Sequence, residues 1–414
     1  MSEYELVIRA RRAVVDGEVR QAAVAVERGR IVAVHIGAGA RSVGLVGDHL
    51  LELGDDVVLL PGLVDTHVNV DDPGEREWQG FEAVTEAASR GGVTTVCDLP
   101  LDSAPIVDDP VTLERLGDAA TGYSYADVGF WGSATPATLG SLQVLWEHGV
   151  FGLACSLVDR GPDAHPALDA EQLDRVMAEV AAFDGLLAVD TGEEVSGVEL
   201  VLDAARRTGC RVHLVRFSVA EALPALRAAR ADGVPVTAEV CAHLLSLSAE
   251  RLGNSAEVAE RWCPPVRDAA HREQLWAALR DGTIDCVVSG HSPEATASVQ
   301  LSLPVTWSEA RLRGFGLPDL ARWMSANTAA LVGLDDRGGI REGACADFCV
   351  FADDEAFVVL PERLQHTDPR SAFVGRALAG VVRYPVLDGK EVGPRLLPRG
   401  RQLRRTDGVR RPLA

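Results

Sequence analysis

The sequence predicts an α/β protein: a (β/α)₈ barrel with a small β-sandwich domain built from both ends of the chain. From residue 57 to about residue 338, short apolar runs alternate with amphipathic, Ala-rich stretches. About eight such units fit a closed barrel of parallel strands better than an open sheet. Before and after this region, apolar and polar positions alternate over short runs, which is typical of half-buried antiparallel strands.

The elements follow from these two patterns in chain order. Near the N-terminus, alternating runs at 5–9, 22–27 and 30–34 are punctuated by Gly17 and Gly29, so we expect short antiparallel strands. In the central region we expect helices, each followed by a strand: helix 81–91 and strand 94–98, helix 142–148 and strand 152–157, helix 170–183 and strand 186–190, helix 197–208 and strand 211–217, helix 220–232 and strand 235–241, and helix 269–281 and strand 284–289.

Strand patterns return at 341–351, 380–383 and 386–392. We therefore expect three units. Residues 1–58 and 339–400 form the β-sandwich domain, residues 59–338 form the barrel, and residues 401–414 form a tail. This Arg- and Pro-rich tail is expected either to pack in an extended form on a neighbour or to be disordered.

The bulk composition limits the classes of partner. The chain has 414 residues, with 40 Lys and Arg against 61 Asp and Glu, so its formal charge is −21. This acidic excess disfavours nucleic acids and anionic membranes as partners. No apolar run approaches about 18 residues and the N-terminus lacks an apolar signal core. The 8 cysteines form no Cys-x-x-Cys pair. We therefore expect buried free thiols and a cytoplasmic protein.

Candidate functional residues are sought where the barrel strands end, because in this fold chemistry lies at the carboxyl ends of the strands and in the loops that follow them. The polar residues that the pattern places there and that we single out are His67, Asn69, Asp71, Asp102, Asp190, Arg216, His243 and His291. Asp65 and Asp98 are expected to anchor strand ends, and His213 to make a structural contact inside its strand.

Several of these stretches resemble a known family. Pro61-Gly-Leu-Val-Asp-Thr-His67 and the residues that follow it to Gly74 are similar to a motif of the amidohydrolase superfamily. The stretch 91–103 is similar to the allantoinase version and less so to dihydroorotases. Further stretches fit the same resemblance: 78–81, 212–222, 239–243, 262–267, 289–293 and 322–327. The resemblance covers nearly the whole chain, flanking strands included.

The resemblance implies a hydrolase with two divalent metals, held by a His-x-His pair, a carboxylated lysine, two later histidines and an aspartate that also moves a proton. In this sequence only His67 keeps the family residue. The other ligand positions carry Asn69 for the second histidine, Ala154 for the lysine, Asp190 for the third histidine, Arg216 for the fourth and Gly290 for the aspartate. Asp71 and Asp102 stand where allantoinases tend to carry Asn. We therefore expect no metal and no other cofactor.

The sequence leaves several functions open. The first is an enzyme that acts without metal on a small polar ureide- or amide-like compound, by C–N ring opening or closing, elimination or isomerisation. His67, Asp190 and His291 would be catalytic, and Asn69, Asp71, Asp102, Arg216 and His243 would bind substrate.

The alternative is a non-catalytic homologue that acts as scaffold, regulator or ligand-binding partner. A hydrolase with one metal held by His67 and Asp190 is a third, weaker reading. Asp190 and Arg216 are predicted to meet, either as a functional pair or as an ion pair that fills an empty metal site. Cys155 is a weak candidate nucleophile. The resemblance implies a homo-oligomer, a dimer or a tetramer.

Overall fold

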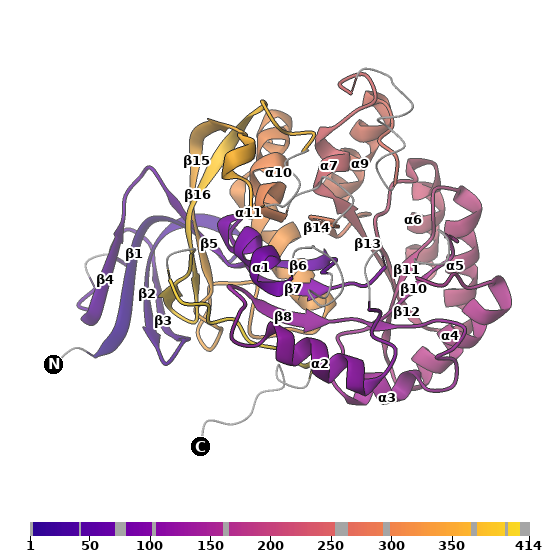
Figure 1. Cartoon of the computed structure of the whole chain (residues 1–414). Coiled ribbons are helices and arrows are strands. Elements are labelled where there is room, and N and C mark those ends of the chain that lie inside the picture. The colour runs from indigo at the N-terminus through magenta and orange to yellow at the C-terminus, as the bar shows by residue number, and fades with distance from the viewer. Residues whose placement is uncertain are drawn as a thin grey trace.

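The structure is a computed structural model. It describes residues 3–40, 43–70, 80–101, 105–159, 165–252, 264–292, 299–365, 371–393 and 396–405. A parallel barrel lies at its centre (Figure 1). Its strands are β6 (Leu63–Val68), β7 (Val93–Asp98), β8 (Asp127–Phe130), β9 (Gly132–Ser133), β10 (Leu153–Ser156), β11 (Leu186–Asp190), β12 (Arg211–Leu214), β13 (Val236–Cys241) and β14 (Cys286–Val288).

Hydrogen bonds close these strands into a ring. The order is β6-β7-β8 in one sheet and β14-β13-β12-β11-β10-β9 in the other. Only Trp131 separates β8 from β9, so the two act as one barrel strand. At the other seam, Val68 bridges His291 in parallel and the Asn69 amide donates to the His291 carbonyl at 2.8 Å. The predicted (β/α)₈ barrel is therefore confirmed.

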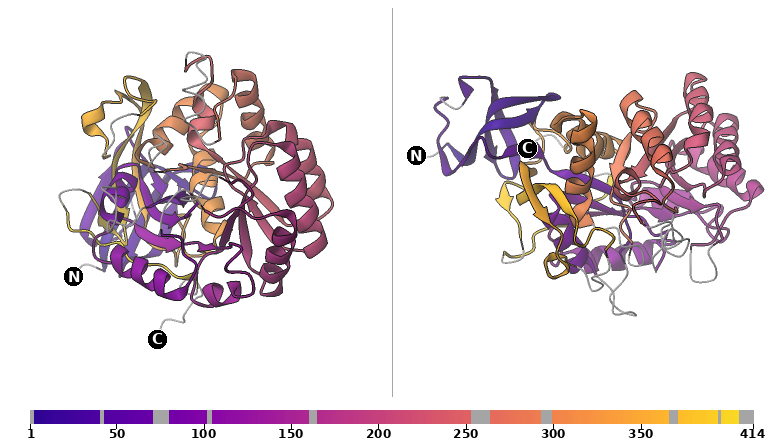
Figure 2. Two further views of the ribbon diagram at one scale, coloured as in Figure 1. Left: turned by 45° about the vertical axis from the view of Figure 1, so that its right-hand side comes forward. Right: turned by 90° about the horizontal axis from the view of Figure 1, so that it is seen from above.

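Helices surround the barrel (Figure 2). They are α1 (Phe81–Arg90), α2 (Pro110–Ala120), α3 (Leu142–Glu147), α4 (Ala170–Ala182), α5 (Val195–Thr208), α6 (Leu223–Ala231), α7 (Ala242–Ser246), α9 (Ala269–Asp281), α10 (Ser302–Ala310), α11 (Leu317–Ala321) and α12 (Asn327–Leu331). Asp109, Asp169 and Asp268 cap three of them by accepting hydrogen bonds from first-turn amides. Among the described residues, no helix is both long and apolar enough to cross a lipid bilayer.

Both chain ends contribute strands to the small β-domain, which lies at one side of the barrel in Figure 1. The strands are β1 (Tyr4–Val15), β2 (Glu18–Glu27), β3 (Arg30–Ile36), β4 (Gly47–Leu53), β5 (Val58–Pro61), β15 (Phe348–Val358), β16 (Ala377–Leu387) and β17 (Lys390–Glu391). β5 pairs with β1 and with β15, so it joins the two chain ends in one sheet. The predicted small β-domain built from both chain ends is thus confirmed, and β5 extends past the predicted domain limit at residue 58.

The described part of the tail packs on the barrel of its own chain. The Val128 amide donates to the Arg401 carbonyl at 2.9 Å, and the Leu403 amide donates to the Val128 carbonyl at 2.7 Å. The Arg405 guanidinium lies 3.6 Å from the centre of the Trp146 ring. For residues 401–405, the expectation of disorder or of packing on a neighbour is therefore corrected. Residues 406–414 lie outside the described residues.

Candidate active site

Two buried histidines share one buried carboxylate at the mouth of the barrel. His67 lies in β6, His213 in β12 and Glu239 in β13. Glu239 Oε1 lies 2.5 Å from His67 Nδ1, and Glu239 Oε2 lies 3.1 Å from His213 Nε2. Burial by itself raises the pKa of Glu239, but the two histidines outweigh burial and hold the pKa well below its usual range. Glu239 is therefore a carboxylate at physiological pH.

The two nitrogens of the His67 ring have different surroundings: Nδ1 faces Glu239, and Nε2 lies on the opposite side of the ring. His67 is 0% exposed, and its Nε2 has no hydrogen-bond partner in the part of the chain that the structure describes. A buried polar atom without a partner costs free energy, so such atoms need an explanation. His67 Nε2 is therefore placed to make a hydrogen bond with a ligand bound at the barrel mouth.

His243 follows β13 at the same end of the barrel and is 2% exposed. Burial, together with the nearby positive charge of Arg216 and the neighbouring His67, lowers the pKa of His243 to about 3. His243 is therefore neutral at physiological pH, so it can exchange hydrogen bonds with a ligand but cannot supply a positive charge.

Asp190 and Arg216 form a buried ion pair. Arg216 Nη2 lies 2.5 Å from Asp190 Oδ2, and Asp190 Oδ1 accepts the Gly192 amide at 3.1 Å. Asp190 is 3% exposed and Arg216 is 5% exposed. The prediction that these two side chains meet is therefore confirmed.

Arg216 also has an unusual backbone. Its φ is +51°, in the left-handed region that residues other than glycine rarely adopt. The other non-glycine residues described with positive φ each precede a glycine: Asp16, Arg28, Asp184 and Asp388. Arg216 precedes Phe217 instead, and the Arg216 amide donates to Glu239 Oε1 at 3.3 Å. Strained backbone of this kind collects at functional sites.

The Asn69 side chain makes hydrogen bonds at the seam between β6 and β14. Its Nδ2 donates to the His291 carbonyl at 2.9 Å, and its Oδ1 accepts the Leu101 amide at 3.3 Å. Asp65 acts in a similar way, because it accepts the amides of His67 and Ser289. Burial raises the pKa of Asp65 to about 6. These contacts give Asn69 a structural task in addition to the predicted contact with substrate.

The remaining predicted residues have different outcomes. His291 is 1% exposed and lies after β14 at the seam, beside Asn69. Asp71 and Asp102 lie outside the described residues. Asp98 accepts the Val70 amide at 3.0 Å, so its predicted anchoring task is confirmed. Cys155 is buried and burial raises the pKa of its thiol far above the usual range, which removes its case as a nucleophile.

Sequence reasoning missed Glu239. The stretch that contains it was recognised, but the carboxylate itself was not singled out. A signal was available, since an acidic residue in the middle of a buried strand is rare unless it is paired. His213 was expected to make a structural contact, and the structure shows that the contact is to Glu239.

The side chains present do not fit the two-metal centre that the family resemblance implies. Ala154 offers no donor atom, and Asp190 is paired with the guanidinium of Arg216. A guanidinium cannot ligate a cation and repels one nearby. Across the described ranges, no group of three or more His, Cys, Asp or Glu side chains is arranged to hold a metal ion. The described side chains therefore do not supply the ligands of a two-metal centre.

An aspartate at position 290 does not fit the backbone conformation and packing around Gly290. Its φ is +58°, and a Cβ built there would lie 2.5 Å from Cys241 Sγ. We expect Gly290→Asp to lower the free energy of unfolding by about 2–4 kcal/mol, through backbone strain and overpacking. Chemical denaturation of the full chain measures this change.

Gly282→Asp is the matched control, because Gly282 has a φ of +78° but open space around its Cβ position. Gly282→Asp has the backbone strain of a positive φ but no close contact at its Cβ. We therefore expect it to lower the free energy of unfolding by a smaller amount, about 1–2 kcal/mol. Equal losses in the two variants would contradict the clash with Cys241.

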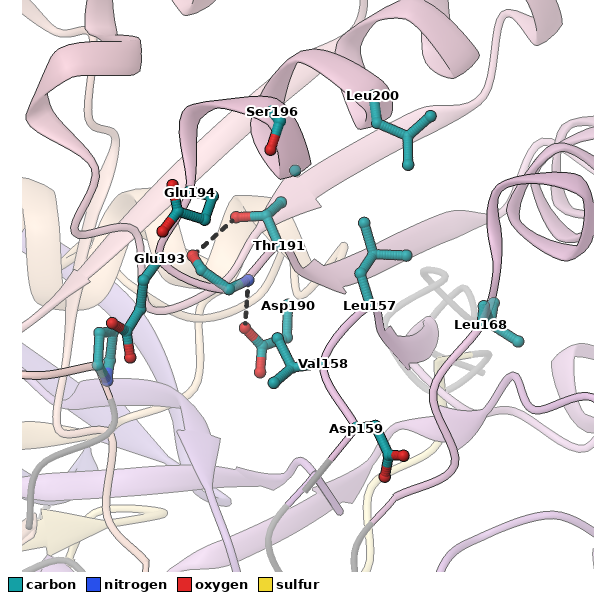
Figure 3. A pocket seen from close by; sticks show the side chains of 13 residues that line it. Leu157, Val158, Asp159, Leu168, Asp190, Thr191, Glu193, Glu194, Ser196 and Leu200 are labelled. Atoms are coloured by element: carbon teal, nitrogen blue, oxygen red, sulfur yellow. Dashed lines mark hydrogen bonds between the residues drawn. The ribbon is translucent and has the colours of Figure 1, made fainter. Parts of the chain in front are cut away.

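A cavity of about 740 Å³ opens beside the ion pair, at the carboxyl ends of β10 and β11. Its walls are apolar at Leu157, Val158 and Leu168, and acidic at Glu193 and Glu194. Asp190 lines this cavity, where its carboxylate accepts the Gly192 amide (Figure 3). The cavity has the size of a small-molecule site.

Comparison with known proteins agrees with the architecture. Residues 58–392 match the model of the amidohydrolase family. The chain is 43% identical to an allantoinase of Streptomyces avermitilis over 98% of this chain and 100% of that protein. It is 32% identical to an allantoinase of Saccharomyces cerevisiae, over 83% of this chain and 84% of that protein.

Among solved structures, the L-hydantoinase (dihydropyrimidinase) from Arthrobacter aurescens superposes with a TM-score of 0.85 at 20% identity, over 97% of both chains. This likeness concerns the fold. The family match and the sequence relatives together show that the chain belongs to the amidohydrolase family, among its allantoinase-like members.

Proposed function

We propose that this protein binds a small polar ureide- or amide-like compound at the barrel mouth and transforms it without a metal pair. The reaction class is C–N ring opening or closing, elimination or isomerisation. The observation that carries the proposal is His67, whose ring is held by Glu239 on one side and has an unpartnered buried nitrogen on the other, within the described residues. A histidine with this arrangement is suited to proton transfer.

The other predicted site residues take roles around His67 in this proposal. Arg216 polarises or binds an electron-rich group of the ligand while Asp190 holds it in place. His291 is a second candidate for moving a proton, and neutral His243 exchanges hydrogen bonds with the ligand. The relatives' names support the substrate class, because those proteins are allantoinases.

The test uses the full chain after treatment with a chelator. Metal content is measured, and conversion of allantoin and related ureides is followed by NMR. We expect any turnover to persist without metal and to fall by about 10²–10⁴-fold in His67→Gln, since general acid–base catalysis contributes this much. His49→Gln is the control, because His49 is exposed on β4. Turnover that requires about two equivalents of zinc would overturn the proposal.

A second function has one observation in its favour. The Asp190–Arg216 ion pair satisfies two charges within the chain, as expected for a mouth that needs no ligand. A non-catalytic homologue would show binding without turnover, or neither. Thermal shifts with the same ureides separate these cases, because a ligand that binds the folded state raises the midpoint of unfolding.

A further inference from the structure

The carboxylate of Glu239 faces three groups, one from β6 and two from β12 and the residues just after it. Both of its oxygens face an imidazole nitrogen, and Oε1 also accepts the Arg216 amide at 3.3 Å. Glu239 is 1% exposed, while His67 and His213 are each 0% exposed. Water does not compete for these contacts, so their geometry decides where the protons lie.

Charge settles the direction of each hydrogen bond. A carboxylate can only accept, so the ring nitrogens that face it must carry protons. His67 therefore has its proton on Nδ1 and His213 has its proton on Nε2. His213 Nδ1 lies 2.8 Å from the Thr237 hydroxyl oxygen.

The neighbouring carboxylate does not disturb this assignment. Asp65 lies close to His67, but Asp65 Oδ1 accepts the backbone amide of His67 and Oδ2 accepts the Ser289 amide. These two contacts are to backbone amides and leave the imidazole to Glu239. When the His67 ring is neutral and its proton lies on Nδ1, Nε2 presents a lone pair.

We propose that Glu239 is a positioning residue that locks His67 in the Nδ1–H tautomer, with His213 restraining the second carboxylate oxygen. The consequence is a ligand requirement: the group that meets His67 Nε2 must donate an N–H or O–H. Ureides, amides and imides meet this requirement, whereas a carboxylate or phosphate anion does not. The inference rests on the proposed function for its ligand class, but the tautomer itself does not depend on any turnover.

The proton balance of the resulting step is simple. The ligand N–H gives its proton to His67 Nε2, and the electron pair stays on the ligand nitrogen. His67 becomes an imidazolium, whose charge is balanced by Glu239 at 2.5 Å. The proton then returns to the product, which restores the neutral ring. No co-reactant is required for this transfer.

NMR of the full-length protein with ¹⁵N-labelled histidine tests the assignment without a substrate. His67→Gln identifies the signals of His67. In the wild type we expect a protonated Nδ1 with a strongly deshielded proton, and an unprotonated Nε2. In Glu239→Gln we expect the deshielded proton signal to disappear and His67 to populate both tautomers. Glu309→Gln is the control, since Glu309 is a buried carboxylate that pairs with Arg251 and Arg313.

The outcomes separate this inference from the proposed function. A wild-type His67 with its proton on Nε2 would overturn the inference, and so would a Glu239→Gln spectrum like that of the wild type. The wild-type spectrum decides the tautomer even if Glu239→Gln fails to fold. His213→Gln gives a further check, because it should retain the deshielded His67 proton. The expected spectrum together with an absence of ligand binding would instead defeat the proposed function alone.

Discussion

Replacing Arg337 with Met should lower the free energy of unfolding by about 3–5 kcal/mol, the usual cost of breaking a buried ion pair from one side. Arg337 Nη2 lies 2.6 Å from Asp127 Oδ2, and Nη1 pairs with Asp347. All three residues are buried: Arg337 is 5% exposed, Asp347 is 7% exposed and Asp127 is 0% exposed. Removing the guanidinium leaves two carboxylates in the interior without their cation.

The loss should depend on pH. Burial raises the pKa of Asp347 to about 7, and Arg337 opposes this rise. Burial likewise raises the pKa of Asp127. Without Arg337 both values rise further. A carboxylate whose pKa is raised by folding binds more protons in the folded state, so stability is highest below the unfolded pKa and falls as the pH rises through the folded pKa. The deficit of Arg337→Met should therefore be smaller at about pH 5 than at about pH 8.

Urea denaturation at several pH values measures both effects. Arg207→Met is the matched control, because the Arg207–Asp174 pair is exposed and such pairs contribute about 0–1 kcal/mol. A deficit below about 1 kcal/mol for Arg337→Met, or one that grows on acidification, would contradict this account.

Arg337 illustrates what the sequence does not reveal. Asp127 belongs to β8 and also accepts the Arg401 amide from the tail at 3.0 Å. Asp347 precedes β15 and accepts the Asp388 amide from the turn after β16 at 2.9 Å. The ion pairs thus connect barrel, β-domain and tail. Nothing in the local pattern indicates such a contact, because its members are far apart along the chain.

Local periodicity predicted the barrel well where it is regular. The strand at 186–190 and the helix at 269–281 have the predicted bounds. The strand predicted over 211–217 ends at Leu214 instead. Its apolar run continues, but Arg216 adopts a positive φ, which breaks the strand. The helix at Pro110–Ala120 and strand β8 were not predicted individually.

The candidate site was predictable in part for a similar reason. The rule that polar residues gather at strand ends found His67, Asp190 and Arg216. The rule could not assign their partners, because these depend on which strands are neighbours and on how each side chain is turned. Glu239 lies within β13 rather than after it, so this rule passed over it, and its distance to His67 shows its importance.

The Asp190–Arg216 pair gives the second large effect. Asp190→Leu should lower the free energy of unfolding by about 3–5 kcal/mol, because it leaves a buried guanidinium without its carboxylate. Arg216→Met should cost a similar amount. The left-handed backbone at residue 216 adds nothing to this difference, since Arg and Met both carry a Cβ and share the strain.

The double variant decides what the pair is for. Replacing a buried ion pair by apolar side chains of similar volume is often neutral or stabilising by about 1–4 kcal/mol. We therefore expect the double variant to recover most of the stability lost by either single variant, as a double-mutant cycle measures. Single variants that lose less than about 1 kcal/mol would contradict the buried pair.

The double variant also separates the two roles of the pair. If it folds well but no longer shows a ureide-induced rise in the midpoint of unfolding, the pair takes part in ligand binding. If the ureide-induced thermal shift is kept, the pair only fills the place where the metals of the family would lie, and His67 with Glu239 acts independently of the pair.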